Sequence, residues 1–403
     1  MTLWPTATLR DVTSRITKGT TPTTIGGRFT PDGIAFVKVE SITADGRINP
    51  AKLAFIDEDT NRLLVRSALA ADDLLFSIAG TVGRVARVAE RDLPANTNQA
   101  LAILRPNKDV VDVGYLLYCL RDEARVDRAR TRIVQSVQAN LSLSELADME
   151  LPLPPILEQR GISATLGALD DKIESNRREI ALLDALFHSR WQLLYDERCQ
   201  TEVLLGDVVT TQYGLTASAG SDPRGVKFLR VTDINKTNWL SWPSIPTVSP
   251  AEAGDGKYHL QRGDLLVARM ADPGKSALYD DDDIPAVFAS YLVRLHPRTY
   301  DEGLFLFGFL KSRHYLDYAA GAMTGSVQKN MNARVIVDTC LRWPDPAGLK
   351  EFAAGASSIR GTLNAKLREI TRLSTLRDTL LPELLTGRVR VPEAFDAIEE
   401  VSA

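Results

Sequence analysis

The stretch LPLPPILEQRGISATLGALDDKIESNRREIALLDAL, residues 151–186, decides how this chain of 403 residues folds. Its prolines break regular structure, so they mark the point where a preceding domain ends and a new segment begins. After them, apolar side chains recur at alternating spacings of four and three residues, which is the seam pattern of a coiled coil. The seam positions are Ile162, Leu166, Leu169, Ile173, Asn176, Ile180, Leu183 and Phe187.

The same pattern returns later in the chain, at Phe352, Ala356, Ile359, Leu363, Lys366, Ile370, Leu373, Leu380 and Leu384. We therefore expect two long helices that pair as an antiparallel coiled coil. A helix over most of residues 156–196 would be roughly 60 Å long at about 1.5 Å per residue, which suits a spacer. Asn176 and Lys366 hold equivalent seam positions, where a polar group fixes register. The alternative is that both lie beside the seam and face water.

An internal repeat connects the two halves. SVQAN at 136–140 matches SVQKN at 326–330, an offset of 190 residues, and FVKVESI at 36–42 matches FLRVTDI at 228–234. The offsets drift slowly, as they do when loops gain and lose residues while a framework stays. Each half is therefore one copy of the same unit.

Within each copy, short β-branched runs punctuated by glycine, proline and asparagine predict strands and turns, followed by a helical stretch around residues 112–132 in the first copy. We predict an α+β fold with two tandem, pseudo-repeated, mixed α/β domains separated by the spacer helices. The expected bounds are a first domain at 1–155, a central helix at 156–200, a second domain at 201–345, a C-terminal helix at 346–391 and a tail at 392–403.

Composition describes an ordinary globular protein, with 44% hydrophobic and 25% charged residues. The sequence holds no apolar run long enough for a membrane span and no signal-peptide pattern, so we expect a cytoplasmic protein without membrane association. Cys119, Cys199 and Cys340 stand far apart, without a second ligand at metal spacing. We expect packing thiols and no metal site.

The net charge of −4 gives no support to nucleic-acid binding, which usually relies on a basic surface. Enzyme motifs are equally scarce. Gly274-Lys275-Ser276 looks like the end of a phosphate-binding loop, but Arg269 stands where that loop requires a glycine. Paired acids such as Asp72 with Asp73 lie at predicted turns, with no histidine or cysteine set beside them.

The duplicated copies, SVQAN, the stretch at 151–186 and the ending LRDTLLPELLTGRVRV at 376–391 resemble the specificity subunits of type I restriction-modification systems. The resemblance covers nearly the whole chain. It implies two target-recognition domains, each contacting one half of a split sequence in double-stranded DNA, and helices that bind two DNA methyltransferase subunits. It also implies restriction and translocase subunits as further partners.

By the same resemblance the chain is not an enzyme and carries no cofactor. Adenine methylation and cleavage, with S-adenosylmethionine, ATP and magnesium, belong to the partner subunits. The sequence has no Asn-Pro-Pro-aromatic methylation motif and no glycine-rich cofactor loop after a strand.

Several polar stretches are candidates for DNA contact. The initial loops TKGTTPTT at 17–24 and TQYGLTAS at 211–218 can approach a backbone closely, although such residues also simply close turns. The repeated stretch SVQ(A/K)N favours a structural or phosphate-positioning role, because two domains that read different half-sites should not share a base-reading motif. AGTVGR at 79–84 and ADPGKS at 271–276 predict equivalent hairpins near the DNA.

Arg121, Arg125, Arg128 and Arg132 recur at helical spacing and predict a basic stripe for phosphates, the alternative being a solvated face paired with neighbouring acids. Base reading is expected where the copies diverge most, from Asn235 to Tyr258. Trp239 and Trp242 in that segment are more typical of packing.

The complete set of predicted DNA contacts is Lys18, Gly19, Thr20, Thr21, Arg47, Lys52, Thr81, Arg84, Arg121, Arg125, Arg128, Arg132, Gln138, Tyr213, Lys257, Arg269, Lys275, Gln328 and Lys329. Two other interpretations stay open. Within the same class, the partner could instead be a fused nuclease-methyltransferase or a solitary methyltransferase with no nuclease. A different class of function is a protein scaffold that binds no DNA.

Overall fold

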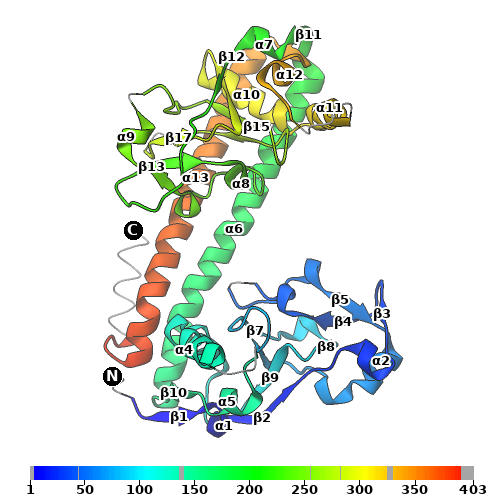
Figure 1. Ribbon diagram of the computed structural model, residues 1–403, viewed down its shortest axis with the longest axis vertical. Coiled ribbons are helices and arrows are strands. Elements are labelled where there is room, and N and C mark those ends of the chain that lie inside the picture. Colours follow the sequence, from blue (N-terminus) through cyan, green and yellow to red (C-terminus); the bar gives the residue numbers. More distant parts are fainter. Residues whose placement is uncertain are drawn as a thin grey trace. The chain divides into compact units, whose positions relative to one another are not determined.

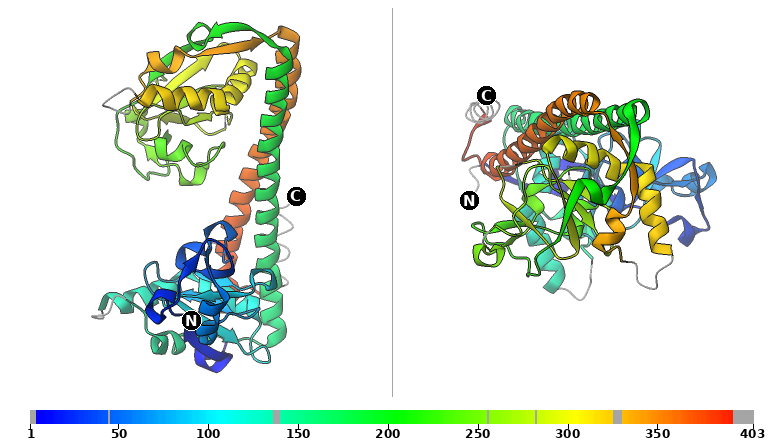
Figure 2. Two further views of the ribbon diagram at one scale, coloured as in Figure 1. Left: turned by 90° about the vertical axis from the view of Figure 1, so that its right-hand side faces the viewer. Right: turned by 90° about the horizontal axis from the view of Figure 1, so that it is seen from above.

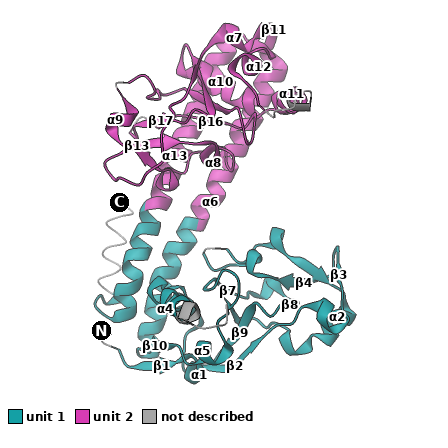
Figure 3. Cartoon of the chain, in the orientation of Figure 1, with its two compact units in different colours: residues 1–173, 372–403 teal, residues 174–371 magenta. Residues whose placement is uncertain are grey.

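The computed structural model describes residues 4–43, 45–135, 140–254, 256–281, 283–324 and 330–391. The chain divides into two compact units, residues 1–173 with 372–403 and residues 174–371 (Figure 3). Each unit holds one copy of the repeat together with parts of two long helices. These are α6 (Ile156–Arg198) and α13 (Pro346–Thr386).

Unit 1 holds a small mixed domain next to its helix segments (Figure 1). Its elements are β1 (Thr6–Thr8), α1 (Leu9–Val12), β2 (Thr13–Lys18), β3 (Phe29–Thr30), β4 (Ile34–Val37), β5 (Ala54–Ile56), α2 (Glu58–Leu63), β6 (Leu74–Ser77), β7 (Val85–Arg87), β8 (Ala95–Thr97), β9 (Leu101–Pro106), α3 (Val113–Arg121), α4 (Glu123–Gln135), α5 (Leu143–Ala147) and β10 (Glu150–Pro152). Strand order is β2-β9-β6-β7 in one sheet and β3-β5-β4-β8 in another, and β1 pairs with β10.

Unit 2 repeats this plan. Its elements are β11 (Cys199–Leu204), α7 (Leu205–Val208), β12 (Val209–Tyr213), β13 (Val226–Leu229), α8 (Val231–Ile234), β14 (Thr247–Val248), α9 (Pro250–Ala253), β15 (Leu265–Ala268), β16 (Ser276–Leu278), β17 (Ala286–Phe288), β18 (Leu292–Pro297), α10 (Tyr300–Lys311), α11 (Arg313–Thr324), α12 (Ala333–Val337) and β19 (Cys340–Pro344). The corresponding sheet orders are β12-β18-β15-β16 and β14-β13-β17, and β11 pairs with β19.

The repeat extends to details of pairing. In each unit the second sheet contains one parallel pair, β4 with β8 and β13 with β17, beside antiparallel neighbours. A fully buried aspartate precedes the central strand of the first sheet in both units. Asp73 binds Arg105 through two hydrogen bonds of 2.7 and 2.8 Å, and Asp264 lies 2.6 Å from His296 Nδ1. These acids hold the sheets together, as buried charges require a partner.

The two long helices pair in opposite directions. Arg377 of α13 lies 2.7 Å from Asp170 of α6 within unit 1, and Arg198 near the end of α6 lies 2.8 Å from Asp345, just before α13, within unit 2. Residue numbers therefore rise along one helix as they fall along the other. Within unit 2 the helix segments lie side by side in both orientations (Figure 2). The expected α+β class with two long antiparallel helices is confirmed.

Most of the predicted seam residues are buried at 9% exposure or less, the exceptions being Leu183, Lys366 and Ile370, which are partly buried. α13 ends at Thr386, five residues before the expected 391, because Gly387 adopts a left-handed conformation at φ +76° that stops a helix. α6 ends at Arg198, and the strand β11 begins at Cys199.

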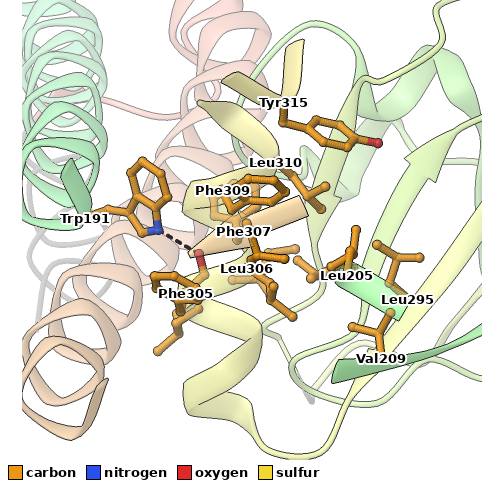
Figure 4. Packing of buried hydrophobic residues seen from close by; sticks show 14 of the residues in the cluster. Trp191, Leu205, Val209, Leu295, Phe305, Leu306, Phe307, Phe309, Leu310 and Tyr315 are labelled. Carbon is orange, nitrogen blue, oxygen red and sulfur yellow. Dashed lines mark hydrogen bonds between the residues drawn. The ribbon is translucent and has the colours of Figure 1, made fainter. Parts of the chain in front are cut away.

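The core of unit 2 joins its domain to the helices (Figure 4). Trp191 of α6 donates its indole N–H to the carbonyl of Phe305 over 2.8 Å, and both lie in one apolar cluster with Phe187 and Phe352. A buried indole needs such a partner. The domain is therefore packed directly onto α6 and α13 within this unit. In the described ranges, no helix is long and apolar enough to cross a bilayer.

Candidate nucleic-acid interface

The two initial loops make the same close backbone approach. A Cβ on Gly19 would lie 2.0 Å from the carbonyl oxygen of Thr97, and one on Gly214 would lie 2.3 Å from that of Ala289. Any larger residue would push these segments apart. The glycines thus hold each loop against a strand end, while Lys18 and Tyr213 just before them are exposed. In each loop the glycine closes the turn, and the residue just before it, Lys18 or Tyr213, is the exposed candidate for DNA contact.

The predicted hairpin turns differ between the units. In unit 1, Arg84 directs Nη1 to the carbonyl oxygens of Val39 and Ile42, at 3.3 and 3.4 Å. Its counterpart in unit 2 is Lys275, which is exposed and whose ammonium has no hydrogen-bond or ion-pair partner within the described part of the chain. The Arg84 guanidinium is therefore partly used in hydrogen bonds within the protein, whereas the Lys275 ammonium can still donate to a ligand.

Three predicted stretches of unit 2 meet at one place. The guanidinium of Arg269 stands 4.9 Å from the ring centre of Tyr213, and its Nε donates to Asn330 Oδ1 at 3.4 Å. The Tyr213 hydroxyl accepts the backbone N–H of Ala333. The initial loop, the start of the hairpin and the end of SVQKN therefore form one polar cluster, in which Tyr213 is exposed and Arg269 and Asn330 are partly exposed. An arginine stacked on a tyrosine ring is a rigid donor for phosphate or a base edge.

The repeated SVQ(A/K)N stretches carry Gln138, Gln328 and Lys329, which lie outside the described residues. The residue directly after each stretch is informative. The N–H of Leu141 donates to the carbonyl of Ile78 and that of Met331 to Arg269, both over 2.9 Å, and both apolar side chains are buried. Each stretch thus ends on the same anchor to the first sheet, which agrees with a shared structural task.

The expected single-helix arginine stripe is wrong. α3 ends at Arg121 and α4 begins at Glu123, with Asp122 between them in an extended conformation, so the four arginines do not share one helix. Arg121 contacts Asp170 of α6 at 2.9 Å, and Arg125 donates to the carbonyl of Glu150 at 2.7 Å. Both side chains are only 13% exposed. The break at Asp122 turns them toward the protein.

The other two arginines of the predicted stripe, Arg128 and Arg132, lie on α4. Arg128 is exposed and directs Nε to the carbonyl of Ala124 in its own helix. Arg132 belongs to α4, but its side chain lies outside the described residues. Because its side chain is exposed, Arg128 is a better candidate for a phosphate contact than Arg121 or Arg125.

The remaining predicted contacts divide by their partners. Arg47 lies 3.2 Å from Asp171 and 3.6 Å from Asp45, so its charge is largely balanced. Lys257 lies over the ring of Tyr258 at 5.1 Å and is exposed. The other members are exposed or partly exposed around the initial loop, the hairpin or the segment after β4: Thr20, Thr21, Lys52 and Thr81.

The divergent segment of unit 2 folds over its own sheet. Trp242 packs edge-on against Tyr279, with ring centres 6.0 Å apart, and contacts the apolar cluster around Leu240 and Ile245. Trp239 is partly buried. Trp242 therefore packs, as expected, and the exposed lysines of this segment, Lys236 and Lys257, are the better candidates for contact.

Sequence reasoning missed a group of charges next to α6. Lys311 at the end of α10 donates to the backbone carbonyl of Ser276 over 2.6 Å, and burial lowers the pKa of its ammonium to about 8. Burial also lowers the pKa of His188, against the opposing effect of Asp184. Arg360 of α13 is 1% exposed and lies 2.6 Å from Asp280. Spacing alone could not reveal this group, because its members come from four distant segments.

Taken together, the exposed groups offer cations, amides and hydroxyls suited to contact a phosphate backbone and base edges. Among the described residues, no cluster of three histidine, cysteine or acidic side chains could hold a metal ion. Cys119 and Cys199 are buried, and burial raises the pKa of Cys199 to about 11, which makes it a poor nucleophile. Cys340 is exposed, so the expectation of a packing thiol is wrong at that position.

Comparisons with known proteins agree with this reading. Residues 4–185 match a family described as the type I restriction modification DNA specificity domain. A putative type I restriction enzyme MjaX specificity subunit from Methanocaldococcus jannaschii is 26% identical over 96% of this chain and 94% of its own length. The specificity subunit of the EcoBI enzyme from Escherichia coli is 30% identical over 32% of this chain and 27% of its own.

A solved structure shares the fold. The specificity subunit of a type I restriction-modification system from M. genitalium superposes with a TM-score of 0.59 at 14% identity, covering 95% of this chain and 96% of that one. Its likeness extends through both copies of the repeat and both long helices. Residues 4–185 therefore match the DNA specificity domain of type I restriction-modification systems, and nearly the whole chain is similar to a specificity subunit of such a system.

Proposed function

We propose that the chain reads a split, asymmetric DNA sequence, one half with each domain, and so directs its partner subunits to methylate adenine or to cleave. The observation that carries this proposal is that one topology occurs twice while the exposed side chains at equivalent positions differ. A shared frame with different contacts suits two unlike half-sites, whereas identical contacts would suit a palindrome.

Particular positions support the difference. Arg269 of unit 2 stands where the repeat places Ile78 in unit 1, so the stacked arginine of one domain has no counterpart in the other. Among the described residues the ammonium of Lys275 has no partner, whereas the guanidinium of Arg84 is hydrogen-bonded. The segment before β14 carries Trp239 and Trp242, against ADGRINPAKLAF at 44–55 in the first copy. The two surfaces should therefore prefer different sequences.

The partners in this proposal are two methyltransferase subunits and the restriction and translocase subunits, which supply S-adenosylmethionine, ATP and magnesium chemistry. An apolar stripe on α6 offers a docking surface for a methyltransferase. Leu182, Leu186 and Leu193 are 70%, 48% and 58% exposed, and their spacing places them on one helical face. Exposed leucines in a row mark a protein contact more often than a solvated helix face.

The test is to express the chain with its neighbouring methyltransferase gene and to map methylated adenines by single-molecule sequencing. We expect a split motif with one methylated adenine in each half. Exchanging residues 201–345 for those of a relative should alter one half only, and exchanging residues 1–155 should alter the other. If either exchange alters both halves of the motif, the proposal that each domain reads one half is contradicted.

A protein scaffold without DNA contact is the second candidate, and the net charge of −4 favours it. Such a scaffold would form a stable complex with the methyltransferase and yet leave the methylation pattern unchanged. Weak DNA binding by the isolated chain does not distinguish the two, because a near-neutral reader gains most of its affinity from basic partners that complete the clamp.

A further inference from the structure

A cavity of about 250 Å³ lies inside unit 2, between α6, the turn before β16 and the end of α10. Its lining includes His188, Lys236, Lys275, Ser276 and Lys311. A space of this size is smaller than the pockets that hold drug-sized molecules, and it suits a single small group such as a phosphate.

The cavity is cationic. Lys236, Lys275 and Lys311 come from three separate segments, and none of the described residues that line the space is acidic. The ammonium groups of Lys236 and Lys275 are exposed, and neither has an ion-pair partner in the described ranges. Three ammonium groups around one small space repel each other unless an anion lies among them.

Two acids lie next to the lining without belonging to it: Asp272, whose Oδ2 accepts a hydrogen bond from Asn235 Nδ2 over 3.1 Å, and Asp184. The Oδ2 of Asp184 accepts a hydrogen bond from Asn238 Nδ2 over 2.8 Å, and its Oδ1 lies 3.7 Å from His188 Nε2. The effect of Asp184 raises the pKa of Lys311, yet burial and the charges of Lys275 and Arg360 outweigh it. The cavity therefore keeps a net positive character.

The lining also contains a buried hydroxyl, that of Ser276. Ser276 is 0% exposed, its Oγ has no hydrogen-bond partner among the described residues, and it lines the cavity. A buried hydroxyl without a partner destabilises the folded state. The equivalent position in unit 1 is Val85, which is apolar and buried in its sheet. The serine belongs to unit 2 alone, and a hydroxyl at this position can donate one hydrogen bond.

The corresponding region of unit 1 contains an acid, Asp170, whose equivalent position in unit 2 is not acidic. There Asp170 binds Arg121 at 2.9 Å, Arg377 at 2.7 Å and the Tyr118 hydroxyl at 2.9 Å. At the offset of 190 residues, the counterpart of Arg121 is Lys311.

The counterpart of the acid itself is a base, because the same offset places Arg360 at the position of Asp170. Arg360 forms an ion pair with Asp280. It cannot neutralise Lys311, because both side chains are cations. Unit 2 therefore keeps the cation at the end of α10 but has replaced the carboxylate that would neutralise it.

We infer that this cavity binds a phosphate group of the DNA backbone, with Lys236 and Lys275 as charged contacts and the Ser276 hydroxyl as a directional donor. The inference rests on the proposed function and adds a fixed phosphate contact to unit 2 that unit 1 does not share. Such a contact sets the register of the second domain on the duplex without reading its sequence. A free inorganic phosphate would present the same oxygens, so the test separates the two sources.

The first arm measures DNA binding by the complex with the methyltransferase, on a duplex carrying the mapped motif, across a range of salt concentrations. Lys275→Ala should weaken binding roughly tenfold and lower the slope of log affinity against log salt by about 0.9, as loss of one phosphate contact does. Ser276→Val should weaken binding with the slope unchanged, because a hydroxyl carries no charge. Lys350→Ala, an exposed lysine of α13 outside the lining, is the control.

The methylated sequence should stay the same in all three variants, which separates a positioning contact from a reading contact. Far-ultraviolet circular dichroism should show unchanged folding, and valine at 276 copies what unit 1 already accommodates at Val85. If wild-type complex binds the motif while Lys275→Ala and Ser276→Val keep its affinity and slope, the inference is overturned and the proposed function stands. If the wild-type complex does not recognise DNA, both are overturned.

The second arm titrates inorganic phosphate into the DNA-free protein at constant ionic strength and follows the midpoint of thermal unfolding. A ligand that binds only the folded state raises this midpoint. A rise in the wild type that Ser276→Val abolishes, together with weaker DNA binding by that variant, supports the inference. The same rise with unchanged DNA binding by the variant assigns the cavity to a free anion and overturns the DNA contact.

Discussion

Lys366 of α13 donates a hydrogen bond to Asn176 of α6 over 3.3 Å, and the two residues occupy the same position in their respective repeats. Asn176 is 0% exposed, so it lies within the seam and does not face water. Lys366 also lies 3.0 Å from Glu179. The duplication has thus placed two polar residues opposite each other at a single level of the antiparallel pair. A polar pair at one level of an apolar seam fixes the register.

Asn176→Leu should raise the free energy of unfolding by about 1–3 kcal/mol. The reason is that Nδ2 of Asn176 is buried without a partner among the described residues, and leucine removes that group while Lys366 keeps Glu179. Urea unfolding followed by circular dichroism measures the change, and Ile180→Ala in the same seam is the destabilising control. A less stable Asn176→Leu protein would show that the hydrogen bond with Lys366 outweighs the cost of the orphan amide.

Asp170→Asn should destabilise the protein by about 3–5 kcal/mol near neutral pH, because it leaves Arg121 and Arg377 without their shared buried carboxylate. Burial raises the pKa of Asp170, but Arg121 and Arg377 outweigh it and hold the pKa below its ordinary value. This stabilisation is present above the unfolded pKa and is lost as pH falls through the folded one. The difference between the two proteins should therefore shrink in acid.

The neighbour Asp171 provides a matched control. Its side chain is 82% exposed and meets Arg47 at 3.2 Å. Exposed ion pairs contribute about 0–1 kcal/mol, so Asp171→Asn should change stability little at any pH. Equal effects of the two substitutions in chemical unfolding would contradict the assignment of the buried network to Asp170.

Lys311→Met should stabilise unit 2 more at pH 7 than at pH 10. The folded pKa of Lys311 is about 8 against an ordinary 10.5, so between these values the unfolded chain binds the proton and the folded one does not. Wild-type stability therefore rises with pH across this window, whereas the methionine protein lacks that contribution. The groups that act on Lys311 are Asp184, Lys275 and Arg360. A stability difference that stays constant from pH 7 to 10 is incompatible with a depressed lysine.

Leu186→Glu should prevent co-purification of the methyltransferase while leaving the fold intact. Leu186 is 48% exposed on the stripe with Leu182, so a charge there costs little in the free chain and is costly once a partner covers it. The control is Ala181→Glu, an exposed position roughly 140° from Leu186 around α6. Size-exclusion chromatography of the co-expressed subunits distinguishes the two variants. Retention of the partner by Leu186→Glu would exclude this stripe as its docking surface.

The sequence by itself determined the repeat, the two long helices and the strand-rich domains, because these depend on periodic patterns that each segment carries locally. Alternating spacings of four and three residues specify a helical seam wherever they occur. The offset of 190 residues likewise placed Asn176 and Lys366 at equivalent positions before any contact was known. Such features need no information about distant partners.

Only the tertiary structure decided which charges are available. The arginine spacing from Arg121 to Arg132 indicated one face, yet the break at Asp122 and the carboxylate of Asp170 turn part of it inward. Lys275 and Lys311 are far apart in the sequence, and they line one cavity because the turn before β16 lies next to α6 and α10 in the fold. The strength of a charge depends on burial and on partners from remote segments, and a linear pattern contains neither.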